Sequence, residues 1–269
     1  MEPFLKWAGG KRWLLEATKD RSLSLRALYA PHQERRLVDL FTGAGSVVFG
    51  LAPRRAIMND LNPHLINCLR YAQLGMSVEE SGVPMVLDRD VFTKNRCRFN
   101  ELARTDTFLR EQAILFYYLN RTAYNGLCRF NRRGEFNAPF GKYTKVNFLN
   151  DFAEYDRAMR GWKITRRDFA QVQTLPGDFL FADPPYDGDD GAFVGYWSTP
   201  FTWDDQVRLA RLLSIHQGPV VATNKATPRI LALYQSLGFE THLVSAPRRI
   251  SCKARVPVQE MVATKGVYS

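Results

Sequence analysis

In the N-terminal and C-terminal parts of the chain, apolar patterns typical of strands alternate with apolar patterns typical of helices. Short continuous apolar runs are typical of buried strands, and apolar residues that recur every three or four positions are typical of amphipathic helices. Strands are predicted at 37–41, 56–59, 163–165, 179–182, 219–223, 239–244 and 258–263, and helices at 46–51, 203–215 and 228–237. No helix is predicted between the last two strands, so we expect them to form an antiparallel hairpin.

The middle of the chain has a different pattern. From about residue 61 to residue 118 the spacing is helical, with Leu65, Leu69 and Ala72 on one face, and a basic stretch rich in Gly and Asn follows to about residue 150. The alternation on either side predicts an α/β fold, a Rossmann-like sheet interrupted by an insertion. We therefore expect one domain made of residues 1–60 and 151–269, and a mainly helical inserted domain at 61–150.

Composition narrows the class of protein. Of the 269 residues, 45% are apolar, which is ample for a core. The chain has no run of about 18 apolar residues and no signal-peptide pattern, so we expect a cytoplasmic protein without a membrane span. Cys68, Cys97, Cys128 and Cys252 share no metal-binding spacing with each other or with the histidines. We therefore expect neither disulfides nor a metal site.

The net charge of +10 is distributed unevenly along the chain. Between Arg121 and Lys145 there are six basic residues and a single acid, Glu135. Such a run is commonly just a solvated face. Aromatic residues are interleaved through this stretch: Tyr124, Phe130, Phe136, Phe140 and Tyr143. Because aromatic rings can wedge between or stack on bases, the combination favours nucleic-acid binding.

The tetrapeptide Asp183-Pro184-Pro185-Tyr186 follows the predicted strand 179–182. It should lie at the carboxyl edge of the sheet, where α/β proteins bind ligands, and two prolines stiffen the turn. The carboxylate and the proline carbonyls can accept hydrogen bonds from an exocyclic amino group, and Tyr186 offers a face for stacking a planar ring. A plain strand-ending turn is the alternative interpretation.

A second motif, Phe41 to Ser46, reads FTGAGS and follows the first predicted strand. Val48 stands where a dinucleotide-binding GxGxxG loop has its third glycine, so Gly43 and Gly45 favour a smaller ligand. Asp60 ends the next strand, where an acid can accept hydrogen bonds from ribose hydroxyls. A tight turn with a helix-capping acid is the alternative.

Two further segments complete the expected pocket. The N-terminal arm around Trp7 and Lys11 is too short and too rich in glycine for a helix, and its alternative role is to cover a sheet edge. Asp168 and Phe169 follow the strand 163–165 and could supply an amino-group acceptor and an apolar face for an adenine ring. A helix cap with a core phenylalanine explains them equally well.

Taken together, these motifs resemble the Dam-like family of DNA adenine-N6 methyltransferases, the α-group enzymes of the D12 class, over nearly the whole chain. The most specific part is the segment 118–131 followed by 134–143, which is similar to the DNA-reading β-hairpin of enzymes that methylate GATC. Asn125-Gly126 alone is also a common hairpin turn. The resemblance implies a methyltransferase sheet, a target-recognition domain at 61–150, S-adenosylmethionine as cofactor and double-stranded DNA as partner, in a bacterial or phage-encoded enzyme.

The resemblance also implies a role for each site residue. Asp183, Pro184, Pro185 and Tyr186 would hold the target adenine. Cofactor contacts would come from Trp7, Lys11, Phe41, Gly43, Gly45, Ser46, Asp60, Asp168, Phe169 and Asp183. Base and gap contacts would come from Lys6, Tyr124, Asn125, Leu127, Arg129 and Pro139, and phosphate contacts from Arg96, Arg121, Asn137, Lys142 and Lys145. Tyr143 would also bind the DNA.

Three alternatives stay open at this point. An amino-methyltransferase acting on RNA adenine or on a protein amide would share the cofactor loop and a proline-rich tetrapeptide. A catalytically silent DNA-binding relative would share the fold, and a nicotinamide enzyme is disfavoured by Val48. The sequence predicts no obligate protein partner, and it carries no sign of biological role, processivity, oligomeric state, preference for hemimethylated DNA or a role for residues 187–198.

Overall fold

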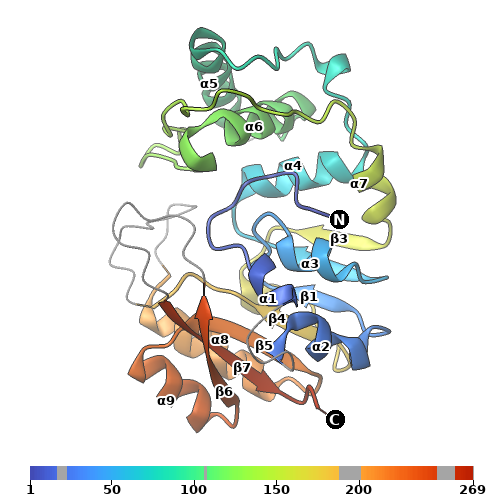
Figure 1. Cartoon of the computed structure of the whole chain (residues 1–269), viewed down its shortest axis with the longest axis vertical. Helices are drawn as coiled ribbons and strands as arrows, with labels where there is room; N and C mark the ends of the chain where they lie inside the picture. The colour runs from blue at the N-terminus through green and yellow to red at the C-terminus, as the bar shows by residue number, and fades with distance from the viewer. Residues whose placement is uncertain (17–22, 106–107, 188–200, 247–257, 269) are drawn as a thin grey trace.

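A seven-stranded sheet and the helices that cover it form the larger part of the molecule (Figure 1). The computed structural model describes residues 1–16, 23–105, 108–187, 201–246 and 258–268. The strand order is β3-β2-β1-β4-β5-β7-β6. The first five are parallel, and β7 pairs antiparallel with both β5 and β6. The strands are β1 Leu37–Asp39, β2 Ala56–Asn59, β3 Trp162–Thr165, β4 Phe179–Ala182, β5 Val220–Lys225, β6 Glu240–Ala246 and β7 Val258–Lys265.

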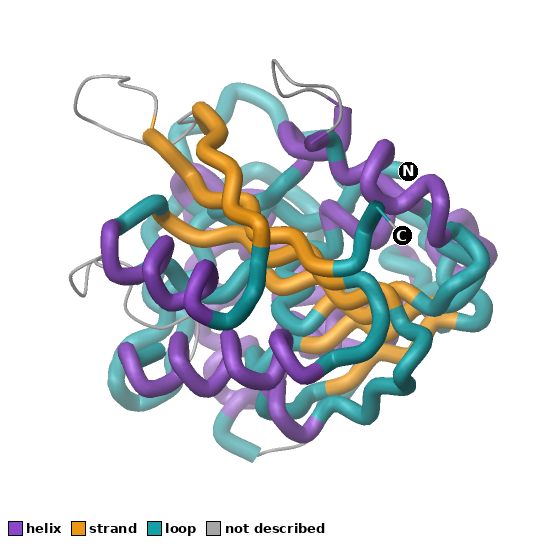
Figure 2. Tube along the Cα trace, turned by 90° about the horizontal axis from the view of Figure 1, so that it is seen from below, coloured by secondary structure: helices purple, strands orange, loops and turns teal. Residues whose placement is uncertain are grey.

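The central strands are apolar on both faces because helices cover both faces of the sheet (Figure 2). The helices are α1 Arg12–Glu16, α2 Leu25–Tyr29, α3 Ser46–Leu51, α4 Pro63–Gln73, α5 Arg89–Ala103, α6 Arg110–Thr122, α7 Ala153–Ala158, α8 Trp203–Ile215 and α9 Pro228–Ser236. One core lies under α8 and α9, and the other, under α1 to α3, continues into α4, α5 and α6.

Local signals explain where several helices begin. Thr202 and Asp205 form a reciprocal capping box at the start of α8. Thr227 caps α9 just before Pro228, and Asn62 caps α4 just before Pro63. These caps satisfy backbone N–H groups that would otherwise lack partners at a helix end, so they define the start of each helix from sequence alone.

The inserted segment forms the upper lobe in Figure 1, where α5 and α6 pack together. α6 is buried along Ile114–Leu119, so it is the core of this lobe. α4 contacts α6 on one side and β3 and α7 on the other, and thus joins the two lobes. Residues 127–152 run as irregular chain along α5 and α6, held by aromatic contacts such as Phe92 with Phe140 and Tyr118 with Phe148.

The elements agree closely with the predicted ones, and the Rossmann-like methyltransferase sheet and the C-terminal antiparallel hairpin are confirmed. The main difference at the first strand is length: β1 ends at Asp39, so Leu40 and Phe41 belong to the loop. No helix among the described residues is long and apolar enough to span a membrane. Cys252 and residues 188–198 of the loop without a predicted role lie outside the described residues; the thiols of Cys68, Cys97 and Cys128 are free.

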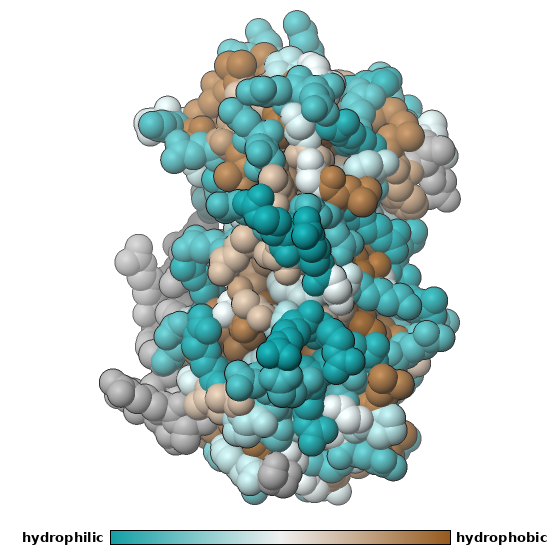
Figure 3. Space-filling model, turned by 90° about the vertical axis from the view of Figure 1, so that its right-hand side faces the viewer, coloured by the Kyte–Doolittle hydropathy of each residue, from teal (hydrophilic) through white to brown (hydrophobic). Residues whose placement is uncertain are grey.

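Surface ion pairs contribute little to this fold. Figure 3 shows the largely hydrophilic face on the right-hand side of Figure 1. Arg54 pairs with Glu34, and Arg12 pairs with Glu2, with all four side chains more than half exposed. Because exposed pairs are screened by water, their contribution to stability is small, and the two apolar cores hold the molecule together.

Candidate active site and nucleic-acid interface

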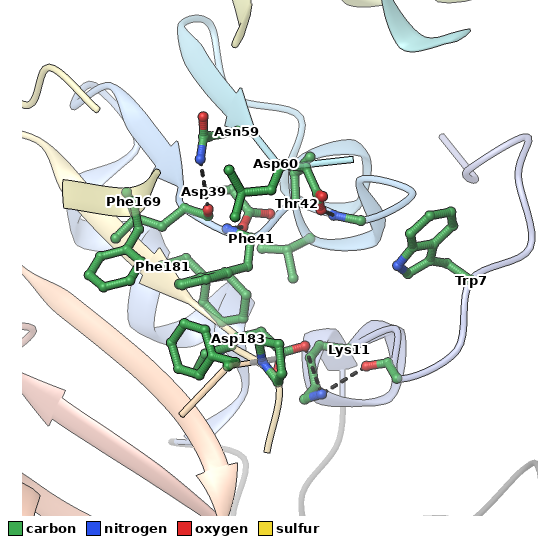
Figure 4. Close-up of a pocket in the computed structure, with 18 of the residues that line it drawn as sticks. Trp7, Lys11, Asp39, Phe41, Thr42, Asn59, Asp60, Phe169, Phe181 and Asp183 are labelled. Carbon is green, nitrogen blue, oxygen red and sulfur yellow. Dashed lines mark hydrogen bonds and ion pairs between the residues drawn. The ribbon is translucent and has the colours of Figure 1, made fainter. Parts of the chain in front are cut away.

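A pocket of about 700 Å³ opens at the carboxyl ends of β1, β2 and β4 (Figure 4). The N-terminal arm, the loop after β1, the turn after β4 and the start of α8 all line it. It brings together every residue that the sequence assigned to the cofactor except Gly45, and all four residues of the tetrapeptide. The edge at which parallel strands end is where α/β sheets bind ligands, so this pocket is the candidate active site.

Asp183 is held from two sides. Its Oδ1 accepts a hydrogen bond from Thr223 Oγ1 at 2.7 Å, and its Oδ2 accepts one from Lys11 Nζ at 2.8 Å. Lys11 is buried and also donates to the Gly9 carbonyl. The sequence placed Lys11 with the cofactor, and the structure puts its ammonium on the Asp183 carboxylate. Thr223 was missed, because nothing in the β5 sequence marks it as a site residue.

Tyr186 is hydrogen-bonded to β7, the last strand in the chain. Its hydroxyl donates to Glu260 Oε2 on β7 at 2.6 Å, and Lys11 Nζ lies 4.8 Å from the ring centroid. Burial, followed by the charges of Asp183 and Glu260, raises the pKa of Tyr186 well above its usual value. The phenol is therefore neutral at physiological pH, with its ring held in a fixed orientation at the pocket wall. Glu260 was also missed.

Asp39 and Asp60 bring two further carboxylates into the pocket (Figure 4). Asp39 is 1% exposed and accepts from the Phe41 N–H, while Asp60 accepts from the N–H groups of Gly43 and Asn62. Burial raises the pKa of both, and the charges of Asp183 and Asp60 add to the effect on Asp39. Asp39 was read only as part of a strand; an acid inside an apolar run just before the GxG turn was the available signal.

The glycines of the loop make room for protein side chains. A Cβ added to Gly43 would lie 2.7 Å from Trp7 Cδ1, and one added to Gly45 would lie 2.5 Å from Met58 Cε. Both glycines have positive φ, which side-chain-bearing residues rarely adopt. The loop therefore depends on glycine for its backbone shape and for docking of the arm, and Ser46 follows as the first residue of α3.

Asp168 has the role of a cap and an ion-pair partner. It caps the short 3₁₀ helix at Phe169–Gln171, and its carboxylate accepts two hydrogen bonds from the Arg208 guanidinium, at 3.1 and 2.8 Å. Phe169 is buried, its ring centroid 5.6 Å from that of Phe41, with the Arg208 guanidinium 4.3 Å above it. Both residues also line the pocket, so the capping role of Asp168 does not exclude the predicted role at the site.

Lys6 lies outside the pocket, where the arm crosses to the upper lobe. The side chain of Asn120 on α6 accepts from the Lys6 N–H at 2.8 Å and donates to the Lys6 carbonyl at 2.7 Å. Lys6 Nζ lies 3.9 Å from the centroid of the Tyr143 ring, and a Cβ on Gly126 would collide with the Lys6 side chain. The arm is thus docked against the basic stretch on which the nucleic-acid prediction depends.

Residues 122–141 form a hairpin of two short arms, which we call the 122–141 hairpin. The β-pairing between these described arms consists of two isolated bridges, Ala123 with Phe140 and Phe130 with Phe136, so the predicted β-hairpin has no continuous strands. The chain reverses at Asn131–Gly134. The hairpin turn considered at Asn125-Gly126 is therefore wrong: these residues form a 3₁₀ turn with positive φ within one arm.

The hairpin gathers most of the proposed base contacts. Tyr124 is exposed, and its N–H donates to the carbonyl of Pro139 on the other arm. Arg129 donates through Nε to Asn137 Oδ1 at 2.9 Å and through Nη2 to the Asn137 carbonyl at 2.8 Å. Asn137, predicted as a phosphate contact, thus supports Arg129. Asn125 and Pro139 are exposed, and Leu127 is half-buried on the same hairpin.

The remaining predicted phosphate contacts have different environments. Lys142 and Lys145 are exposed just beyond the hairpin, and Arg96 is half-buried on α5 over the Phe92 ring. Arg121 differs, because its guanidinium donates to the Asn147 carbonyl and its Nε is buried. Its side chain holds the loop 142–150 in place.

Known proteins resemble this chain over nearly its full length. The family model for the D12 class N6 adenine-specific DNA methyltransferases matches residues 7–250. The chain is 35% identical to the DNA adenine methylase of Escherichia coli strain K12 over 284 residues, covering 97% of this chain and 94% of that protein. It is 32% identical to the Retron Ec67 DNA adenine methylase of Escherichia coli over 280 residues, covering 99% and 92%.

A restriction-modification relative is similar too. The Type II methyltransferase M1.LlaDCHI of Lactococcus lactis subsp. cremoris is 29% identical over 285 residues, covering 98% of this chain and 95% of that protein. These comparisons confirm the family resemblance inferred from the motifs. They also confirm the prediction that the protein is an adenine-specific DNA methyltransferase. The chain belongs to the D12 class of N6 adenine-specific DNA methyltransferases.

Proposed function

We propose that this enzyme takes the methyl group from S-adenosylmethionine and transfers it to N6 of adenine in GATC, after that adenine has rotated out of the duplex. The observation that carries the proposal is the acceptor pair after β4. The Asp183 carboxylate stands beside the Pro184 carbonyl, and no described residue donates a hydrogen bond to that carbonyl. Because the two acceptors line a recessed pocket at the sheet edge, an adenine would have to leave the base stack to reach them.

The chemistry of the pocket fits the cofactor. Asp39 accepts from the Phe41 N–H, Asp60 accepts from the N–H groups of Gly43 and Asn62, and no cation among the described residues forms an ion pair with either carboxylate. S-adenosylmethionine carries positive charge on its sulfonium and on its amino group, so it suits an acidic pocket. Asp60 would hold the ribose, and Phe41, Phe169 and Trp7 would surround the ring. When bound, the cofactor supplies a methyl group on a good leaving group.

The protein's part in transfer is to orient the amine. Adenine N6 is a poor nucleophile because its lone pair is delocalised into the ring. Two hydrogen bonds from N6, one to Asp183 and one to the Pro184 carbonyl, would favour a pyramidal nitrogen whose lone pair points at the methyl group. Tyr186, held by Glu260, would stack on the ring. The buried Lys11 compensates the Asp183 charge beside Asp39 and Asp60.

The 122–141 hairpin would read the duplex. Arg129 presents a fork of donors suited to guanine O6 and N7, and Leu127 with Pro139 would contact a thymine methyl group. Lys6 would contact the first guanine, Tyr124 would fill the gap left by the adenine, and Asn125 would face the orphaned thymine. These assignments are supported by the common location of the residues on the hairpin and on the docked arm.

Protection of plasmid DNA tests the proposal. Unmethylated plasmid treated with the protein and S-adenosylmethionine should resist a nuclease that cuts GATC only when its adenine is unmethylated. Asp183→Ala should give no protection while it still binds the duplex, because the acceptor is lost and the hairpin is intact. Complete cleavage after treatment with the unaltered protein would reject GATC, and sequencing of the modified bases would then report the true site.

A further inference from the structure

Two buried side-chain amides, Gln206 on α8 and Asn224 on β5, lie behind the turn Asp183-Tyr186. They are 1% and 0% exposed, and neither belongs to the pocket lining. We propose that Gln206 and Asn224 are positioning residues that orient the acceptor turn for the target amine. The inference rests on the proposed function, in which Asp183 and the Pro184 carbonyl accept the N6 hydrogens.

The two amides form a continuous chain of hydrogen bonds to the turn. Gln206 Nε2 donates to the Pro185 carbonyl at 2.8 Å, and Asn224 Nδ2 donates to Gln206 Oε1 at 2.9 Å. Asn224 Oδ1 accepts from the N–H groups of Asp187, at 3.2 Å, and Lys225, at 2.8 Å. The chain therefore binds the turn at two backbone positions, one before and one after Tyr186.

The orientation of both amides follows from the backbone. Two N–H donors face one end of Asn224, so that end must be its oxygen, and its NH₂ group must then face Gln206. Gln206 must in turn present its oxygen to Asn224 and its NH₂ group to Pro185. Because a carbonyl can only accept, each hydrogen bond between Asn224, Gln206 and the turn has a single allowed direction. The two amides therefore form a rigid support for the turn.

This support distinguishes the two proline carbonyls. The Pro185 carbonyl is occupied by Gln206, whereas the Pro184 carbonyl receives no hydrogen bond from any described residue. On β5, consecutive residues point to opposite faces: Thr223 donates to Asp183, and Asn224 supports the far side of the turn. The acceptor turn is thus held from both faces of the sheet, and the substrate would use the Pro184 carbonyl and a further lone pair of the Asp183 carboxylate, whose oxygens already accept from Thr223 and Lys11.

Single-turnover methylation of a GATC duplex tests the proposal. Gln206→Met keeps the length of the side chain and removes its N–H donors. We expect its rate at saturating cofactor and DNA to fall about tenfold to a hundredfold, the effect of a small misplacement of reacting groups. Calorimetric affinities for S-adenosylmethionine and for the duplex should stay unchanged. Leu212→Ala, on the same helix but packed against the core, should keep the normal rate.

Gln206→Glu separates positioning from a loss of folding. A neutral carboxylic acid can donate to the Pro185 carbonyl and accept from Asn224, and so restores every contact, whereas the carboxylate cannot donate. Its rate should therefore approach that of the unaltered protein at low pH and fall steeply as pH rises. A normal rate in Gln206→Met, a pH profile of Gln206→Glu parallel to that of the unaltered protein, or equal loss of binding and rate would overturn the inference. Failure of the unaltered protein to methylate GATC would instead reject the proposed function.

Discussion

At the scale of single residues, Asp39 shows how stability and binding oppose each other in the pocket. The carboxyl group is buried next to Asp183 and Asp60, and its pKa is raised well above the usual value. A raised pKa in the folded state means that the folded protein retains a proton that the unfolded chain has already released. Stability from this group is therefore full at low pH, below the pKa of the unfolded chain, and is lost as pH rises through the folded pKa.

Asp39→Asn should stabilise the protein at neutral pH, by about 0.5–2 kcal/mol, because it removes a buried charge and keeps an acceptor for the Phe41 N–H. The same change should weaken S-adenosylmethionine binding, since a carboxylate facing a cationic ligand is lost. Urea unfolding at several pH values and calorimetric titration measure the two effects. Loss of stability at pH 7 would show instead that the Asp39 charge stabilises the fold.

At the scale of elements, the 122–141 hairpin depends on side-chain contacts more than on a ladder of backbone hydrogen bonds. The Arg129 guanidinium lies against Asn137 on the opposite arm. On α5, Asn100 accepts from the Phe136 N–H and donates to the Phe136 carbonyl, which ties the other arm to the helical lobe. The hairpin is thus a preformed surface on which the Arg129 side chain is already oriented.

Arg129→Ala should lower the preference for GATC over other sites by about 1–3 kcal/mol, the value of a bidentate contact to guanine. Arg129→Lys should not restore the preference, because lysine keeps the charge and lacks the planar fork. The matched control is Arg132→Ala, at the exposed tip of the same hairpin, which should weaken all sequences alike. Competition binding between a GATC duplex and duplexes with an altered site measures the preference of each variant. Equal effects of the Arg129 and Arg132 changes on every duplex would contradict a reading role.

At the scale of the whole molecule, the N-terminal arm connects the two lobes. Its Trp7 and Lys11 line the pocket, while its Lys6 is clamped by Asn120 at the base of the hairpin. The arm therefore links the pocket to the hairpin. A change in the upper lobe that releases Lys6 should be detectable in the pocket.

Asn120→Ala should cost about 1–3 kcal/mol of unfolding free energy, since the backbone N–H and carbonyl of Lys6 lose their buried partner, and it should also weaken cofactor binding. Asn100→Ala removes the same kind of clamp from the hairpin but not from the arm, so it should leave cofactor affinity intact. Urea unfolding and titration with S-adenosylmethionine measure both. If the two variants bind the cofactor equally well, the arm does not depend on Asn120.

Much of the fold could be predicted from the sequence because the signals are local. The apolar run at 179–182 and the capping pattern at Thr202 define β4 and α8 to the residue. The turn at Asn125-Gly126 is a place where the local signal is ambiguous, since a 3₁₀ turn and a hairpin turn both accept positive φ at these positions. Their difference depends on Pro139 and Lys6, which contact this stretch from outside it.

By itself, the sequence determined the strand and helix order, the tetrapeptide, the glycine loop and the basic hairpin segment, because each is written in neighbouring residues. The tertiary structure alone decided that Lys11 lies on Asp183, 172 positions away, and that Glu260 holds Tyr186, 74 positions away. It also chose which proline carbonyl stays available, through Gln206. Such contacts depend on how the sheet brings distant strand ends together, and no local pattern of apolar and polar residues records that.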